Sequence, residues 1–304
     1  MSEEGITGTR TPSFPFPRRG LVGLLLISIF WPLNWLLPGL RTYWIFFPLW
    51  LGYALTVDAL AYRRHGTSLY ARSPRKYVGL FLISAPGWWL FELLNARLHN
   101  WYYVGAEYFS DAAYAFWATL SFSTVMPAVF GTAEWAYAQF NGFPAWRQGP
   151  RVPPSRAVVV SFFLAGWGML VLMLIWPRYF FFFLWGSIYL ILEPLNVWLG
   201  HVNLLQWTDR RDWRPIAALW TGVLVTAFFW EMWNFYAYPK WVYNVPFVNF
   251  LHVFEMPLLG YLGYLPFSLE LFALYHFVVG LLGEPKTTYI TAGWCFSKKV
   301  SEMG

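Results

Sequence analysis

The sequence is poor in charged residues and has only one cysteine. Asp, Glu, Lys and Arg make up 12% of the 304 residues, whereas soluble domains typically contain ~25%. A chain with so little charge cannot cover a water-exposed surface, so the composition excludes an ordinary soluble protein and indicates one embedded in lipid. The single cysteine, Cys295, excludes a framework of internal disulfides and a metal site built from cysteines.

Several catalytic motifs are also missing. The five histidines form no His-x-x-His or His-x-x-x-His pair, which excludes a di-iron desaturase or hydroxylase. No lysine lies within an apolar run, which excludes a retinal Schiff base. The sequence has no Walker loop, no Gly-x-Ser-x-Gly and no Gly-rich dinucleotide fingerprint. The sequence contains one Asp-containing loop motif, TDRRDW, but not the second Asp-rich motif that a membrane prenyltransferase has, so this class of enzyme is not indicated. We therefore expect no metal and no organic cofactor.

Long apolar runs and aromatic residues, in contrast, are abundant. A transmembrane helix needs ~20 apolar residues. A membrane β-barrel would instead show strands of ~10 residues in which apolar and polar residues alternate. The fold class is therefore an all-α polytopic membrane protein. Eight spans are predicted, at 20–38, 43–62, 77–96, 114–138, 157–176, 179–202, 214–236 and 250–283. The last run is long enough for two spans, which would make nine.

The basic residues predict the orientation. With eight spans, 17 of the 21 Lys and Arg fall in the two termini and in the loops that share their side of the membrane. The positive-inside rule places that side in the cytoplasm, whereas nine spans would move three C-terminal lysines to the opposite side. We expect a multi-pass protein of the cell membrane with both termini cytoplasmic. Because the basic residues flank apolar spans, no nucleic-acid partner is expected.

The chain also repeats itself. IFWP recurs as LIWP, and FFPLWLGYALTVD recurs as FFFLWGSIYLILE. WLFELLN recurs as FFWEMWN, and a Trp-x-Tyr segment follows each of these two. VMP at 125–127 recurs as EMP at 255–257. Each half has an even number of spans, so the two four-helix repeats are parallel and a pseudo-two-fold axis runs along the membrane normal. This axis should bring Glu92 onto Glu231 and Asp58 onto Glu193.

Four segments follow from the repeat. Residues 1–19 are predicted to be a disordered cytoplasmic tail, 20–150 the first membrane repeat, 151–283 the second, and 284–304 a cytoplasmic C-terminal tail. A functional site is expected between the two repeats.

Acidic residues enter the predicted spans and basic residues do not. Seven of the fifteen acids lie there: Asp58, Glu92, Glu134, Glu193, Glu231, Glu255 and Glu270. Buried acids without basic partners should be neutral, or face a water cavity or a cationic ligand. Such residues are candidates for function, although they also serve as hydrogen-bonding links between helices.

The paired acids and amides are the candidate catalytic residues. Glu and Asn three positions apart share a helix face, and this pair occurs in both halves, as Glu92 with Asn95 and as Glu231 with Asn234. Glu255 is a further candidate acid. We expect Glu92 and Glu231 to lie inside the bundle, lining or bordering one shared apolar cavity.

Six further residues are candidates for binding substrate. Asp58 and Glu193 occupy equivalent places in the second span of each half, and an aromatic pair follows the third span in each half. The aromatic pairs also suit a membrane-interface belt. They are Trp101 with Tyr103 and Trp241 with Tyr243.

A membrane cavity with carboxylic acids, amides, many aromatic faces and no basic residues, which is what we expect here, suits one chemistry, the protonation of an alkene in a lipid-soluble substrate. A neutral carboxylic acid can supply the proton, and aromatic faces stabilise the resulting carbocation. The same acids would also suit a proton-coupled transporter or binding protein for a lipid or small solute, and a non-catalytic subunit of a membrane complex is a third interpretation.

The duplicated pattern resembles the small membrane lycopene cyclases of the heterodimeric and fused type and the related carotenoid hydratases. VDALAYRRHGTSLY, with Asp58, is similar to their first element, and FELLNARLHNWYYVG and WEMWNFYAYPKWVY, with Glu92 and Glu231, are similar to their second. VMPAVFG and EMPLLGYLG occupy the place of their Pro-Glu-Glu motif, but Pro127 is followed by Ala-Val and Pro257 by Leu-Leu.

The resemblance implies an enzyme of hydratase or cyclase type that acts on a long apolar isoprenoid, carotenoid-like substrate. Because the double Glu is missing, it favours a hydratase or another isoprenoid-processing relative over a true cyclase. The partners that it implies are the isoprenoid substrate, membrane lipids and a partner enzyme in the membrane.

Overall fold

The computed structural model describes residues 14–137, 139–140 and 144–294. Within them, eight helical segments are long and apolar enough to cross a membrane, which confirms the predicted all-α polytopic class. The predicted tails fall largely outside the described residues, at 1–13 and 295–304.

The eight segments follow one another along the chain. They are α1 (Arg18–Leu36), α2 (Thr42–His65), α4 (Pro74–Leu98), α5 (Asp111–Phe122) with α6 (Val125–Tyr137), α7 (Arg156–Ile175), α8 (Pro177–Phe180) and η4 (Phe181–Phe183) with α9 (Leu184–Trp198), α11 (Arg214–Phe235), and η5 (Leu258–Gly263) with α12 (Tyr264–Leu281). Two shorter helices, α3 (Leu69–Arg72) and α10 (Leu205–Thr208), follow the second span of each half.

The last predicted span begins too early. Residues 250–257 lie outside the helix and contain a two-stranded turn of β3 (His252–Val253) and β4 (Met256–Pro257). The eighth span is Leu258–Leu281, a single span. Residues 250–257 are therefore apolar without being part of a membrane helix. Pro257, which lacks a backbone N–H, immediately precedes the first residue of the eighth span.

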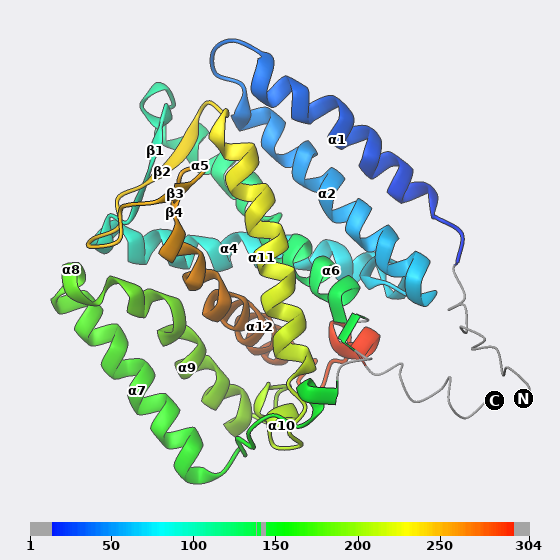
Figure 1. Cartoon of the computed structure of the whole chain (residues 1–304), viewed down its shortest axis with the longest axis vertical. Helices are drawn as coiled ribbons and strands as arrows, with labels where there is room; N and C mark the ends of the chain where they lie inside the picture. The colour runs from blue at the N-terminus through cyan, green and yellow to red at the C-terminus, as the bar shows by residue number, and fades with distance from the viewer. Residues whose placement is uncertain (1–13, 138, 141–143, 295–304) are drawn as a thin grey trace, which may run out of the picture.

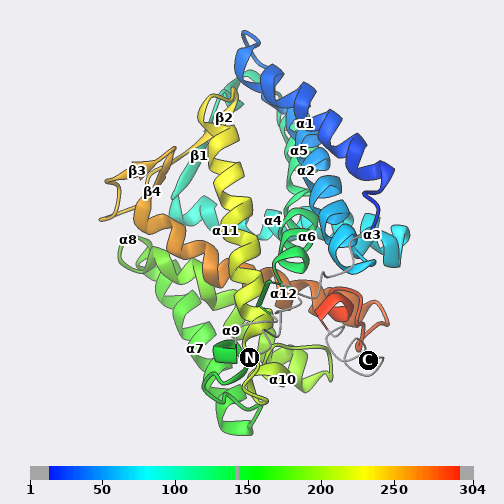
Figure 2. The same cartoon turned by 45° about the vertical axis from the view of Figure 1, so that its right-hand side comes forward.

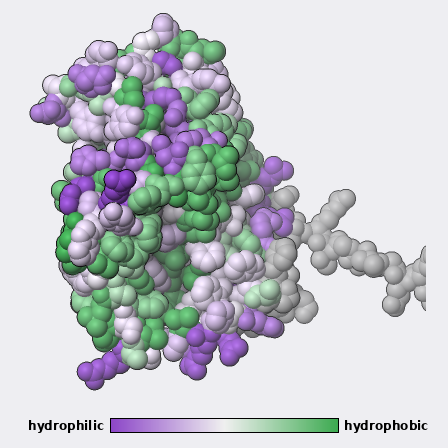
Figure 3. Space-filling model, turned by 60° about the vertical axis from the view of Figure 1, so that its left-hand side comes forward, coloured by the Kyte–Doolittle hydropathy of each residue, from purple (hydrophilic) through white to green (hydrophobic). Residues whose placement is uncertain are grey.

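The two halves occupy opposite flanks of the molecule. α1 packs along α2 on one flank and α7 packs along α9 on the other, with α4, α6, α11 and α12 between them (Figures 1 and 2). In the space-filling view, hydrophobic residues form a broad region between more hydrophilic residues at the two ends (Figure 3). This distribution is the one expected of a protein that spans a lipid bilayer.

A short β-ribbon joins the halves. β1 (Trp101–Val104) pairs antiparallel with β2 (Lys240–Tyr243), so that Trp101 lies opposite Tyr243 and Tyr103 opposite Trp241. This register places a local two-fold axis between Tyr102 and Val242, which exchanges Trp101 with Trp241 and Tyr103 with Tyr243. The ribbon thus has the symmetry that parallel repeats require. We call this end of the bundle the ribbon end.

The opposite end is the terminal end, where α1 begins. Arg19 at this end forms an ion pair with Asp58 near the end of α2. The segment 285–294 also lies here, because Arg72 of α3 donates to the backbone carbonyl of Tyr289. Tyr289, Ile290 and Trp294 are buried, so the described part of the predicted C-terminal tail packs against the helical bundle. Their aromatic and apolar side chains are part of the hydrophobic core.

One anchor of the predicted repeat is not equivalent in the two halves. Met126 and Pro127 lie at the start of α6, in the middle of the fourth span. Met256 and Pro257 form β4, before the eighth span begins. A match of two residues was too short to fix the alignment there.

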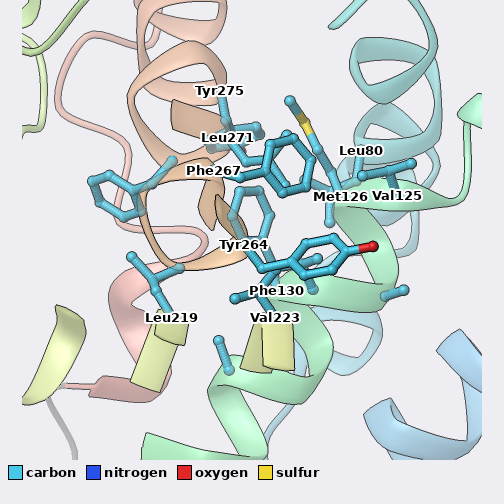
Figure 4. Packing of buried hydrophobic residues seen from close by; sticks show 14 of the residues in the cluster. Leu80, Val125, Met126, Phe130, Leu219, Val223, Tyr264, Phe267, Leu271 and Tyr275 are labelled. Carbon is cyan, nitrogen blue, oxygen red and sulfur yellow. The ribbon is translucent and has the colours of Figure 1, made fainter. Parts of the chain in front are cut away.

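The centre of the bundle is closely packed around α6, α11 and α12. Gly222 on α11 makes this possible, because a Cβ at that position would lie 2.7 Å from the backbone nitrogen of Ala133 on α6. The surrounding side chains interlock in Figure 4, among them Met126, Phe130, Leu219, Val223, Phe267 and Leu271. This contact holds the two halves together below the ribbon.

Candidate functional site

Glu92 of α4 is held by three aromatic donors. Its Oε1 accepts hydrogen bonds from the indole N–H of Trp88 and from that of Trp101, both at 3.0 Å, and from the hydroxyl of Tyr103. Trp88 stands one helical turn before Glu92, whereas Trp101 and Tyr103 come from the ribbon. The chain turns at His99, whose positive φ of 56° lets the ribbon fold back beside the helix.

Glu231 of α11 is held in a similar way by two tyrosines. Its Oε1 accepts hydrogen bonds from the hydroxyls of Tyr243 and Tyr264, each at 2.7 Å. Tyr243 is the ribbon residue that corresponds to Tyr103, and Tyr264 comes from the start of α12. Glu231 is fully buried, and its Oε2 has no hydrogen-bond partner among the described residues.

The ribbon tyrosines act as donors at physiological pH. Burial raises the pKa of Tyr103 and of Tyr243 well above the ordinary value, and the neighbouring Glu92 and Glu231 carboxyl groups raise it further. The hydroxyls therefore keep their protons. Indole N–H groups can only donate, so every described group around Oε1 of either glutamate donates to it.

The rings of all five donors line one cavity of about 170 Å³, which we call the aromatic cavity. That volume is well above the ~15 Å³ that a single water needs. Further walls come from the start of α2 and from α5. Five residues both line the cavity and donate a hydrogen bond to one of the two glutamates: Trp88, Trp101, Tyr103, Tyr243 and Tyr264. Neither Glu92 nor Glu231 is itself part of the lining, so each carboxyl group reaches the cavity only through its donors.

All four aromatic residues predicted to bind substrate line this cavity. Trp101 and Tyr103 of β1, and Trp241 and Tyr243 of β2, form its wall on the ribbon side. Trp241 donates its indole N–H to the Tyr243 hydroxyl at 2.9 Å.

Asn95 and Asn234 fasten the ribbon to the helices. Asn95 donates to the carbonyl of Trp101 at 2.8 Å and accepts from the same residue's N–H at 3.3 Å. Asn234 makes the same two bonds to Trp241, at 2.7 and 3.0 Å. Both amides are buried. The structure thus places them as positioning residues for the ribbon, away from the cavity lining.

Asp58 and Glu193 lie at equivalent positions near the terminal end. Asp58 accepts from the N–H of Tyr70, twelve residues later, at 2.8 Å, and Glu193 accepts from the N–H of Leu205, also twelve residues later, at 2.8 Å. Each acid therefore holds the start of the short helix that follows, α3 or α10. Neither lines the aromatic cavity, so the structure places them outside the predicted substrate site.

The expectation that the buried acids lack basic partners is wrong for Asp58 and Glu134. Arg19 pairs with Asp58 at 2.7 Å, and Arg72 binds both oxygens of Glu134 at 2.6 and 2.8 Å. Arg19 lies in the first turn of α1, and Arg72 lies in α3, outside the spans. Glu255, which is only partly buried, pairs with Lys240. Glu255 itself lies in the loop between β3 and β4, and it does not line the aromatic cavity.

Two residues of the site were missed by the sequence analysis. Trp88 could have been found, because it lies four positions before Glu92 and so on the same helix face. Tyr264 carries no such signal, since it reaches Glu231 from a helix 33 positions later.

No protein-family model, no curated protein and no solved structure matches this chain. The functional argument therefore depends on the residues and their geometry.

Proposed function

We propose that this membrane protein binds a long apolar isoprenoid, carotenoid-like molecule in the aromatic cavity and protonates one of its double bonds. Glu92 and Glu231 are the acids, and the reaction is of hydratase or cyclase type. One observation carries the proposal: both glutamates border a single cavity, and the aromatic side chains that form its wall are the ones that hold their carboxyl groups.

The cavity wall suits an unsaturated apolar chain. Aromatic faces pack well against a polyene and attract positive charge. The expected absence of basic residues is wrong, because Lys240 lines the cavity, but Lys240 is paired with Glu255, which compensates its charge. A carbocation formed beside the rings would therefore meet little repulsion.

Glu231 has an atom suited to proton transfer. The two tyrosine hydroxyls occupy Oε1, while Oε2 is buried without a partner. In the neutral acid the proton resides on Oε2, free of competing acceptors. Its transfer to an alkene carbon forms a C–H bond and leaves a carboxylate and a carbocation. Addition of water and return of one proton to the carboxylate complete a hydration, and attack by a second double bond followed by proton loss completes a cyclisation.

The family resemblance supports the same assignment. The motif that resembles the second element of the lycopene cyclases and carotenoid hydratases carries Glu92 in one half and Glu231 in the other. Alanine and valine follow Pro127, so hydration is favoured over ring formation. We further propose that the terminal end faces the cytoplasm, since the Arg- and Lys-rich segments border it, and that a partner enzyme in the membrane supplies the substrate.

Pigment analysis tests the proposal. The chain is expressed in cells that accumulate lycopene or another acyclic polyene, and the extracted pigments are separated by chromatography and mass. We expect a new product with the mass of added water or an isomeric cyclic product, and its loss in Glu231→Gln. Unchanged pigments with several acyclic polyenes, from a protein shown to be folded in the membrane, would contradict the proposal.

A proton-coupled transporter is the second candidate, favoured by one observation. Glu193, Glu231 and Glu270 each have a buried Oε2 without a partner among the described residues, and they lie on three adjoining helices of the second half. Such a set of acids could pass protons along the bundle. Proton uptake by liposomes that contain the protein, driven by a lipid or solute gradient, would favour this candidate. Product formation without such flux would favour the enzyme.

A further inference from the structure

A second pocket adjoins the aromatic cavity. It has a volume of about 390 Å³, and we call it the side pocket. The two share four lining residues, which form the partition between them: Trp101, Trp185, Tyr243 and Met256. A ligand that passes this partition would therefore enter the aromatic cavity from the side pocket.

The walls of the side pocket suit an uncharged, apolar occupant. No Asp, Glu, Lys or Arg belongs to its described lining, which comes from η4, from the chain after the ribbon and from η5. The aromatic cavity differs, because Lys240 lines it. An ionic ligand would find no partner in the side pocket, whereas a hydrocarbon chain would bury its surface there at ~25 cal/mol per Å².

The mouth of the side pocket is surrounded by exposed apolar residues. Phe182, Leu259 and Leu262 belong to the lining and are also 51%, 46% and 60% exposed. Phe247 and Leu251 extend this apolar surface on the loop before β3. In a protein that spans a bilayer, such a surface faces lipid. The side pocket therefore opens toward the hydrocarbon region or its boundary.

Basic and aromatic side chains mark that boundary. The Arg178 guanidinium lies 5.8 Å from the ring centre of Phe247, and the ring of Tyr179 stacks on the same phenylalanine. Arg and Tyr at such a position keep a polar group near lipid headgroups while their apolar parts stay in contact with lipid. The loop before β3 thus lies at the level where a bilayer molecule would enter.

The partition is built by a close approach of two segments. Gly263 of η5 lies against Trp185, because a Cβ at this glycine would be 2.7 Å from Cδ1 of the indole. Trp185 corresponds to Trp50 in the repeat, and the neighbouring Phe181 corresponds to Phe46, which lines the aromatic cavity. One residue of each pocket is thus related by the repeat, Phe46 in the aromatic cavity and Phe181 in the side pocket.

We propose that the side pocket is a second subsite, through which an isoprenoid chain enters from the bilayer and in which one arm of that chain stays while the other lies in the aromatic cavity. The inference rests on the proposed function, and it adds the route of entry and the place of the unreacted arm.

The test uses photolabelling of the full-length protein in phospholipid liposomes. The probe is a C20 isoprenoid alcohol with a diazirine near one end, and adducts are located by peptide mass spectrometry. In the wild type we expect adducts both in the side pocket, near Phe182 or Leu262, and in the aromatic cavity, near Tyr103 or Tyr114. The blocking variant is Val248→Trp, at a lining residue of the side pocket. Its matched control is Val253→Trp, in β3 directly after that loop and outside the lining of the side pocket.

We expect Val248→Trp to reduce labelling at least fivefold in the side pocket and to slow labelling of the aromatic cavity by a similar factor, whereas Val253→Trp labels like the wild type. Undiminished labelling of the aromatic cavity in Val248→Trp would overturn the inference alone. No labelling of the aromatic cavity in the wild type would overturn the proposed function itself. If Val248→Trp fails to fold by size-exclusion chromatography, Leu262→Trp replaces it with the same expected results.

Discussion

The two ends of the helix bundle use their acidic residues differently. At the terminal end, Asp58 and Glu193 bind the backbone of the short helices that follow them, and Glu134 is paired with Arg72. At the ribbon end, Glu92 and Glu231 bind aromatic side chains that line a cavity. Two pairs of acids make matching contacts in the two halves, Asp58 with Glu193 and Glu92 with Glu231.

The difference shows how burial and function separate. A buried acid that accepts from backbone N–H groups or from an arginine joins the segments around it, and removing one partner of such a buried ion pair is strongly destabilising. An acid that accepts hydrogen bonds from the indole N–H and hydroxyl groups of cavity-lining residues is affected by the ligand that occupies the cavity. Substitutions should therefore affect stability at the terminal end and activity at the ribbon end.

The largest effect is expected at the ion pair of Arg72 and Glu134. Replacing Arg72 by Met leaves the buried Glu134 carboxylate without its two charged hydrogen bonds, which typically costs ~3–5 kcal/mol of stability. We expect a matching fall in the free energy of unfolding in detergent. The double variant Arg72→Met with Glu134→Gln should recover part of the loss. If Arg72→Met were as stable as the wild type, the structural role assigned to the acids of the terminal end would be contradicted.

Next in size is the effect on catalysis at the ribbon end. Gln in place of Glu92 or Glu231 keeps an acceptor for the aromatic donors but cannot give a proton, so the helices should still fold. General acid catalysis contributes ~100-fold or more, and we expect product formation per folded molecule to fall by at least that factor. Full activity of both Gln variants in the pigment assay would break the comparison between the two ends.

A smaller loss of stability is expected when Asp58 or Glu193 is replaced, and the size of the loss should differ between these two equivalent acids. Alanine at Asp58 removes an acceptor of three hydrogen bonds and leaves Arg19 without its partner, whereas alanine at Glu193 removes the capping acceptor of α10. We expect each change to lower stability by ~1–3 kcal/mol, with the larger loss at Asp58, while product formation per folded molecule stays near that of the wild type. Loss of product with normal stability would assign these acids to the site instead.

The smallest effect concerns pH at the terminal end. A hydrogen bond from Lys76 lowers the pKa of Glu284 below its ordinary value of 4.5, so the pair stabilises the fold above that value and the contribution is lost as pH falls through the lowered pKa. Both side chains are 40% or more exposed, which limits the contribution to below ~1 kcal/mol. Glu284→Gln should therefore unfold at a slightly lower temperature than the wild type at pH 7, and at the same temperature once the pH lies below the lowered pKa of Glu284.

Much of the fold could be predicted from the sequence. The length of the apolar runs predicted the spans. The Trp-x-Tyr segments were recognised as a repeat, but their pairing as a β-ribbon was not predicted. The start of the eighth span was predicted too early, because residues 250–257 are as rich in apolar residues as the helix that follows but belong to a loop and a two-stranded turn. The Met-Pro anchor failed for the same reason, because composition in this region does not fix secondary structure.

The candidate site was predicted in part. Glu92, Glu231 and the four ribbon aromatics follow from spacing and from the repeat, and the structure brings them to one cavity. The pairing of Glu255 with Lys240 could not be foreseen, because it depends on how the chain between β2 and β4 folds back. Tyr264 and Trp185 reach the site from segments distant in sequence, where only packing of the two halves places them.

The most direct measurement of the central claim is a structure of the protein, in lipid, with an acyclic polyene such as lycopene bound at saturation. The account predicts elongated density in the aromatic cavity, in contact with the rings of Tyr103 and Tyr243 and with one double bond near Glu231. An empty aromatic cavity at saturating polyene, or density only on the lipid-facing surface, would contradict it.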